Sequence, residues 1–130
     1  GTGTTAATDD DNRPTRRISI AWVVEPDGAG NRIGLEITDE TGAAVNEPVA
    51  ALAGTCSRGL DQDPDAAELG TLLALGCQDG GERHVLRVVR RGGELIVMRG
   101  APDPDAAGAL WFEEHTRIAI PPDAKAVAAE

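Results

Sequence analysis

The stretch VLRVVRRGGELIVMRG, residues 85–100, contains two runs of aliphatic residues separated by a pair of glycines. Two apolar runs joined by a two-residue glycine loop predict an antiparallel β-hairpin. If Gly92 and Gly93 form the turn, Arg91 faces Glu94 and every later pair follows from that register. The stretch therefore predicts a hairpin inside an antiparallel sheet.

The two faces of this hairpin differ in polarity, because successive side chains of a strand point to opposite sides. One face, which we expect to be the core face, carries Leu86, Val88, Leu95 and Val97, with Arg90 and Arg99 at its ends. The other face mixes Val85, Val89, Ile96 and Met98 with Arg87, Arg91 and Glu94. We favour a covered second face, because arginine stems pack along apolar neighbours, over the alternative of a partner-binding surface.

Alternation of apolar and polar residues recurs along the rest of the chain. RISIAWVVE (17–25) and RIGLEITDE (32–40) alternate across the glycine-rich turn at 26–31 and predict a second hairpin. Shorter apolar runs occupy 47–56, 71–78 and 110–121, the last with a break or bulge near Glu113 and Glu114. No segment sustains a helical period, so we predict an all-β fold. The expected architecture is an antiparallel β-sandwich or small β-barrel of about 6–8 short strands, with short helical-turn connectors.

A short repeat marks two of the connections between strands. DPDAAELG at 63–70 resembles DPDAAGAL at 103–110. Aspartate before proline caps exposed N–H groups, and the second aspartate meets the positive end of the helix dipole. Both segments are predicted to be helical-turn connectors.

The length of 130 residues predicts one domain. Residues 1–15 are small, polar and aperiodic, so we expect a flexible N-terminal tether, with a frayed terminus as the alternative. Such a tether would join the domain at 16–122 to a preceding domain or to a lipid anchor upstream of Gly1. Residues 123–130 are expected to be a C-terminal tail, with helical propensity but too short to form an amphipathic helix.

The net charge of −10 bears on the partners. A strongly acidic surface repels phosphates and anionic lipids, and no aromatic residue alternates with the arginines to stack on bases. We therefore expect no nucleic acid. The charge would favour a basic protein partner, with solubility as the common alternative reason for an acidic surface. No run reaches the roughly 18 apolar residues of a membrane span, and no motif for a cofactor is present.

Cys56 and Cys77 are the only cysteines. Each lies beside a predicted strand, so we expect a disulfide closing a loop of about twenty residues, worth about 3 kcal/mol. A disulfide favours an extracytoplasmic location: periplasmic, outer-membrane lipoprotein or secreted. Two buried free thiols in a cytosolic protein are the alternative.

A weak metal candidate is the acidic run that contains Asp61, Asp63, Asp65 and Glu68. Alternating carboxylates can converge on Ca²⁺, but a calcium loop of the EF-hand type needs glycine where Ala66 stands. A solvated connector is the favoured interpretation, and a calcium-stabilised structural domain is a minor alternative.

The two histidines, His84 and His115, give the only hint of proton-transfer chemistry. On a strand, Glu113, His115 and Arg117 would share one face, where a carboxylate could orient an imidazole. No catalytic motif accompanies them, so an ion-paired strand is favoured. A small-ligand-binding barrel or minor enzyme with a cavity near His84 or His115 is the alternative.

Trp22 is expected in the core, while Trp111 and Phe112 point to opposite faces of their strand, so one of them could be an exposed anchor. The sequence thus favours a non-enzymatic, extracytoplasmic binding or assembly module of the bacterial cell envelope that recognises a protein partner. The candidate contact residues are Arg87, Val89, Arg91, Glu94, Ile96, Met98 and Trp111.

Overall fold

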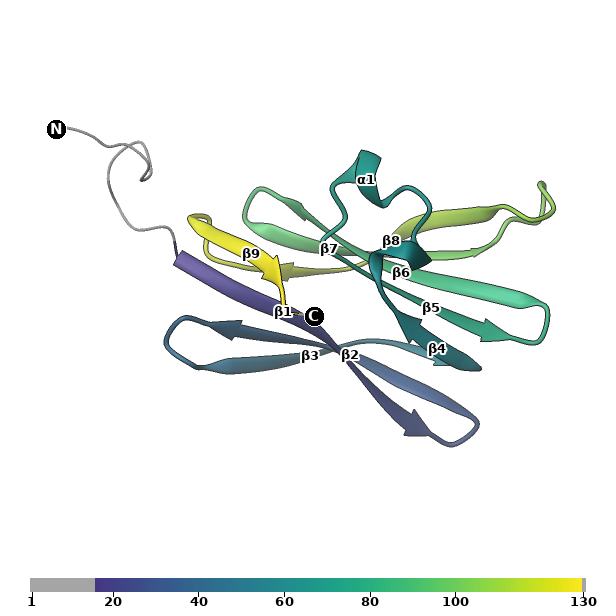
Figure 1. The fold of residues 1–130 in the computed structure, drawn as a ribbon, viewed down its shortest axis with the longest axis horizontal. Helices are drawn as coiled ribbons and strands as arrows, with labels where there is room; N and C mark the ends of the chain where they lie inside the picture. Colours follow the sequence, from purple (N-terminus) through teal and green to yellow (C-terminus); the bar gives the residue numbers. More distant parts are fainter. Residues whose placement is uncertain (1–15, 130) are drawn as a thin grey trace, which may run out of the picture.

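The computed structural model describes residues 16–129, which form two packed β-sheets (Figure 1). The strands of the first sheet, in spatial order, are β3 (Ala44–Ala53), β2 (Gly30–Asp39), β1 (Arg16–Asp27) and β9 (Ala124–Ala128). Those of the second are β4 (Thr55–Arg58), β5 (Leu73–Asp79), β6 (Glu82–Arg91), β7 (Glu94–Pro102) and β8 (Leu110–Ala119). The predicted all-β class is confirmed: of the two expected architectures, the described residues form the sandwich, with nine strands instead of about 6–8. The tether predicted at 1–15 lies outside the described residues.

The register of the β6–β7 hairpin is the predicted one. Arg91 pairs with Glu94, Val88 with Val97 and Leu86 with Arg99. Gly92 adopts φ 59° in the two-residue turn, a left-handed conformation that favours glycine. The glycine pair therefore fixes which side chains of the hairpin enter the core.

The core lies between the two sheets and is built from the inward residues of the alternating strands. Trp22 is 2% exposed, and its indole Nε1 donates a hydrogen bond of 3.0 Å to the carbonyl oxygen of Ala74. This bond joins the first sheet to the second and satisfies the one polar atom of the indole. The other large residues of the core include Ile20, Ile33, Leu35, Leu75, Leu86, Val88, Leu95 and Val97.

Two strands were not foreseen from the sequence. β4 follows Gly54, where the chain passes from the first sheet to the second with φ 91°. A Cβ atom there would lie 2.0 Å from the carbonyl oxygen of Gln78, so only glycine fits. The second unforeseen strand, β9, forms where a C-terminal tail was expected. It pairs in parallel with β1 and buries Ala124 and Ala126. The segment expected to be a C-terminal tail thus contains a strand, whose small side chains pack in the core.

The connection between β4 and β5 contains the 3₁₀ turn η1 (Leu60–Gln62) and the helical turn α1 (Ala66–Leu69). The first predicted helical connector is thus present, whereas the second, at 103–109, forms turns without a helix. Both repeats nevertheless begin alike: Asp63 Oδ1 accepts the N–H of Asp65, and Asp103 Oδ1 that of Asp105. Across residues 16–129, no helix has the length and apolarity needed to cross a bilayer.

Candidate functional site

The segment that links β4 to β5, residues 59–72, covers the outer face of the second sheet, on the side away from the first sheet (Figure 1). We call it the covering segment. Under this cover Val85, Val89 and Ile96 are 0%, 5% and 1% exposed. The mixed face of the hairpin is therefore a second, smaller core, as the covered interpretation expected.

A buried ion pair joins this covering segment to the sheet. The guanidinium of Arg87 on β6 lies 2.8 Å from Asp63, and their side chains are 4% and 0% exposed. Asp63 also accepts hydrogen bonds from Thr71 Oγ1 and from the backbone N–H of Asp65. A buried pair is stable only when further hydrogen bonds satisfy its charges, and Asp63 has them.

The other side of the Arg87 guanidinium faces an aromatic ring. The ring of Phe112 on β8 lies 3.6 Å from the guanidinium carbon, a cation–π contact. The ring reaches Arg87 across Gly100 of β7, where a Cβ atom would lie 2.5 Å from it. The sequence alone predicts no role for Phe112 beyond its face of the strand, and the glycine across from it was the available signal.

The acidic run is not a metal site in this structure. Burial raises the pKa of Asp63, but hydrogen bonds from Arg87, Asp65 and Thr71 outweigh it and lower the pKa below its usual value. Asp63 is thereby already paired with a cation, away from Asp61 and Glu68, which are exposed. In the part of the chain described, no three His, Cys, Asp or Glu side chains are grouped to hold a metal ion. The favoured interpretation of a solvated connector is wrong for Asp63, which is buried, and the calcium alternative gains no support from the described residues.

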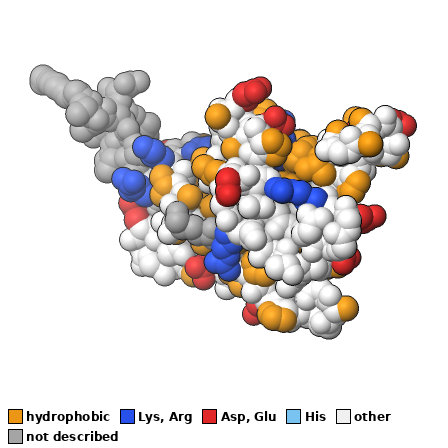
Figure 2. Space-filling view, turned by 45° about the vertical axis from the view of Figure 1, so that its right-hand side comes forward, with side chains coloured by type: hydrophobic (Ala, Val, Ile, Leu, Met, Phe, Trp, Pro, Cys, Tyr) orange, Lys and Arg blue, Asp and Glu red, His pale blue; other side chains and the backbone are white. Residues whose placement is uncertain are grey.

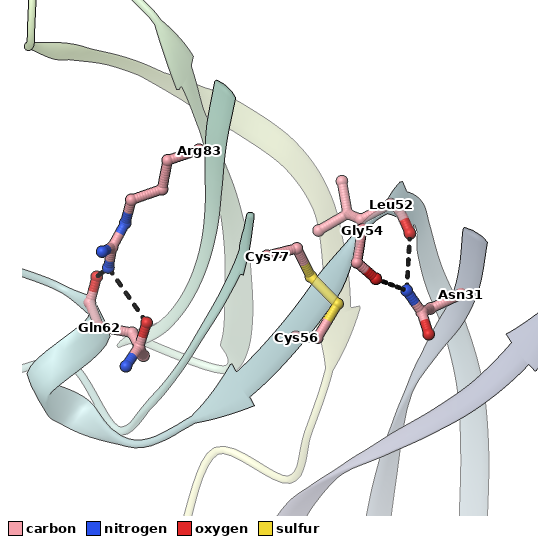
Figure 3. Close-up of a disulfide and its surroundings, with 7 residues drawn as sticks. All are labelled: Asn31, Leu52, Gly54, Cys56, Gln62, Cys77 and Arg83. Atoms are coloured by element: carbon pink, nitrogen blue, oxygen red, sulfur yellow. Dashed lines mark hydrogen bonds between the residues drawn. A yellow bond between two sulfur atoms is a disulfide. The ribbon is translucent and has the colours of Figure 1, made fainter. Parts of the chain in front are cut away.

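The predicted disulfide is present (Figure 3). Cys56 of β4 and Cys77 of β5 face each other directly across the two strands, with their sulfur atoms 2.06 Å apart. Cys77 is 1% exposed, whereas Cys56 is half-buried on the edge strand. The alternative of two free thiols is therefore not the one observed.

Side chains on both sides of the disulfide hold the neighbouring backbone (Figure 3). Asn31 Nδ2 donates to the carbonyl oxygens of Leu52 and Gly54, at 3.1 and 2.8 Å. On the other side, Arg83 donates to the carbonyl and the side-chain oxygen of Gln62. The segments before and after Cys56 are thus each fixed by their own hydrogen bonds.

His84 lies on the strand next to that of Cys77, a position that could not be read directly from the sequence. It faces Cys77 directly in the β5–β6 register, and its Nε2 is 3.4 Å from Glu82 Oε1. Its Nδ1 is buried and has no hydrogen-bond partner among the described residues. The strand register between 71–78 and 82–91 was the signal that could have found it.

The sequence predicts that His115 shares one face of its strand with Glu113 and Arg117, and the structure does not place the three residues on one face. A β-bulge in β8, between the partners of Val97 and Met98, falls at His115 and shifts the faces of the strand. Arg117 consequently binds Glu114 and Glu94 rather than Glu113, and the pKa of Glu114 is lowered by its bond to Arg117. The shared face expected for Glu113, His115 and Arg117 is wrong, although the bulge itself was predicted.

The proposed contact residues separate into two groups. Arg87, Val89 and Ile96 are covered, so they are not available to a partner in this conformation. The accessible ones are Arg91, Glu94, Met98 and, above all, Trp111, which is 61% exposed. Figure 2 shows acidic, basic and hydrophobic side chains interspersed over one face of the molecule.

An apolar groove of about 180 Å³ opens between the sheets near the start of β1. Its walls include Ile37 and Val45 from the first sheet and Ile118 from the second. Neither histidine lines it, so this groove does not supply the cavity that a ligand-binding role for His84 or His115 would need.

Fold and site together define an all-β sandwich domain that carries one disulfide and a buried arginine under a covering segment. Neither a protein-family model, nor a curated protein, nor a solved structure matches this chain. The function is therefore argued from the chemistry of its own residues.

Proposed function

We propose that this protein is a non-enzymatic, extracytoplasmic binding module of the bacterial cell envelope, which contacts a protein partner along strand β8. The observation that carries the proposal is the exposure of Trp111. It is the most exposed large hydrophobic residue described, at 61%, and it lies on an edge strand. Tryptophan is enriched among the residues that contribute most to binding at protein interfaces.

The charge of β8 favours a basic partner. Glu113 is exposed on this strand, whereas Glu114 and Glu94 are paired with Arg117 of the same strand. The molecule as a whole carries a charge of −10, which accelerates encounter with a cationic surface at low salt. A partner with an apolar pocket for Trp111 and basic residues around it fits this strand best.

The disulfide supports the extracytoplasmic part of the proposal. Disulfides form and persist in oxidising compartments, whereas most cytosolic thiols are kept reduced. The Cys56–Cys77 bond closes the segment that covers the outer face of the second sheet. A domain with this design is suited to the periplasm, the outer membrane surface or the external medium.

The test compares the wild-type protein with Trp111→Ala as bait in an envelope extract of the source organism. Val45→Ala is the matched control, because Val45 is another exposed hydrophobic residue, at 50%, on the opposite sheet. We expect a partner that wild type and Val45→Ala retain at low salt and lose at high salt, and that Trp111→Ala fails to retain. Equal capture by Trp111→Ala would contradict the proposal.

A further inference from the structure

Three side chains form a row across the second sheet: Cys56 on β4, Cys77 on β5 and His84 on β6. Each faces the next directly in the antiparallel register. Directly opposed residues of an antiparallel pair have Cβ atoms about 4.5–5.5 Å apart and lie on the same face of the sheet. The imidazole is therefore the immediate neighbour of the disulfide, on the side of Cys77.

One ring nitrogen of His84 has a polar partner and the other has none among the described residues. Nε2 is 3.4 Å from the exposed carboxylate of Glu82, while Nδ1 is buried and unpartnered among residues 16–129. A buried nitrogen without a partner is unfavourable, and a neighbouring thiolate would satisfy it. Sulfur, imidazole and carboxylate in this order are the arrangement that stabilises a thiolate in proteins.

The two sulfur atoms differ in access. Cys56 is half-buried on a four-residue edge strand, whereas Cys77 is 1% exposed. Cys56 is thus the more accessible residue of the two, so an incoming thiolate is expected to attack its sulfur and to release the sulfur of Cys77, which faces His84 in the register. Exchange is faster when the departing thiolate is stabilised, and an N–H of the neighbouring imidazole can donate a hydrogen bond to it.

We propose that Cys56–Cys77 is a redox-active disulfide that exchanges with an external dithiol, and that His84 is the positioning residue that stabilises the departing thiolate of Cys77. One thiolate of the dithiol attacks Cys56, forming a mixed disulfide and releasing Cys77 as a thiolate. The second thiol of the dithiol then loses its proton and attacks its own partner sulfur. Cys56 leaves as a thiolate, and the two electrons and two protons of the dithiol pass to Cys56 and Cys77.

The surrounding contacts allow this cycle to run in the folded domain. Asn31 holds the chain just before Cys56 through Gly54, independently of the disulfide. Arg83 and Arg87 hold Gln62 and Asp63, which lie inside the loop that the disulfide closes. Opening the disulfide therefore leaves the covering segment attached to the second sheet by the bonds of Arg83 and Arg87. The activity is separate from binding through β8.

The experiment treats the oxidised full chain with dithiothreitol, without denaturant, and follows the reduction by quenched alkylation and mass measurement. Wild type is compared with His84→Gln. His115→Gln is the control, because it removes the other histidine, which lies on β8 and is exposed. We expect reduction of the folded protein to be about tenfold slower in His84→Gln and unchanged in His115→Gln. The ultraviolet absorbance of a thiolate should also be present in the reduced wild type and weaker in reduced His84→Gln.

A second variant keeps the test informative if His84→Gln fails to fold. Glu82 has a side chain that is 69% exposed, so Glu82→Gln preserves the fold while removing the carboxylate from the imidazole. We expect it to slow reduction about threefold. The proposal is overturned if neither variant slows the exchange, or if the wild-type disulfide reacts only once the protein unfolds.

Discussion

At the scale of single residues, the most unusual feature is an arginine buried in a hydrophobic face. Arg87 is surrounded by Val85 and Val89 of its own strand, yet it is 4% exposed. Asp63 and the ring of Phe112 compensate its charge from two directions. The pair holds the covering segment at one place on the sheet, a role in structural specificity that ion pairs have in some proteins.

Removal of one member of this pair should destabilise the domain strongly. Asp63→Ala leaves the Arg87 charge buried and uncompensated, so we expect a loss of about 3–5 kcal/mol in the free energy of unfolding. Asp61→Ala, an exposed neighbour, should change it by less than about 0.5 kcal/mol. Urea unfolding measures both. The double variant Asp63→Leu with Arg87→Met should recover most of the loss; no recovery would show that the charge is not the cause.

The same pair gives a stability that depends on pH. The pKa of Asp63 is lower in the folded state than in the unfolded chain, so the folded state favours the ionised form. Its contribution is complete at neutral pH and is lost as the pH falls below about 4. Urea unfolding between pH 3 and pH 7 should therefore give a shallower loss of stability for Asp63→Asn than for wild type.

At the scale of elements, the strand β9 owes its place to contacts from a distant strand. Arg90 of β6 donates hydrogen bonds to the carbonyl oxygens of Pro122 and Ala124, at the entrance to β9. The strand itself has five residues, mostly alanine, with little intrinsic preference for β structure. The arginine and the pairing with β1 therefore determine that the last segment is a strand.

Arg90→Ala should loosen β9 before it affects the rest of the sandwich. Loss of the charged hydrogen bonds to two carbonyls should cost about 1.5 kcal/mol. Amide hydrogen exchange of Ala126 and Val127 should rise accordingly, while that of the β6–β7 hairpin keeps its rate. Arg91→Ala, the exposed neighbour, is the control. Equal exchange in β9 of the two variants would mean that Arg90 does not hold the strand.

At the scale of the whole molecule, the chain passes between the two sheets at Gly54 and returns to the first sheet after β8. The disulfide lies just after the first of these crossings and closes a loop with a sequence separation of 21 residues. It restricts the unfolded chain more than it adds contacts to the folded one. The sandwich core, with Trp22 bonded to the opposite sheet, supplies the larger share of stability.

Replacement of both cysteines by alanine should lower stability without abolishing the fold. The chain-entropy estimate for a loop of this length is about 3 kcal/mol. We expect the double variant to keep the circular dichroism spectrum of a β protein and to unfold at a lower urea concentration. Complete loss of structure would show that the two sheets depend on the disulfide for their assembly.

Much of the fold follows from local sequence. Alternation placed Ile18, Ile20 and Trp22 in the core, and the glycine pair fixed the β6–β7 register. The site was less accessible to prediction, because its parts come from distant segments. Asp63 meets Arg87, and Cys77 meets His84, only after the sheet has formed. The acidic run was therefore predicted as solvated, and His84 was separated from the disulfide.

The sequence by itself determined the all-β class, the core face of each hairpin and the cysteine pair, because a two-residue period and turn glycines act over a few neighbouring residues. Tertiary structure alone decided that the C-terminal segment is a strand and that an arginine is buried under an aspartate. It also set His84 opposite Cys77 in the register of β5 and β6. These outcomes depend on which strands become neighbours, and that is settled by packing between residues far apart in the chain.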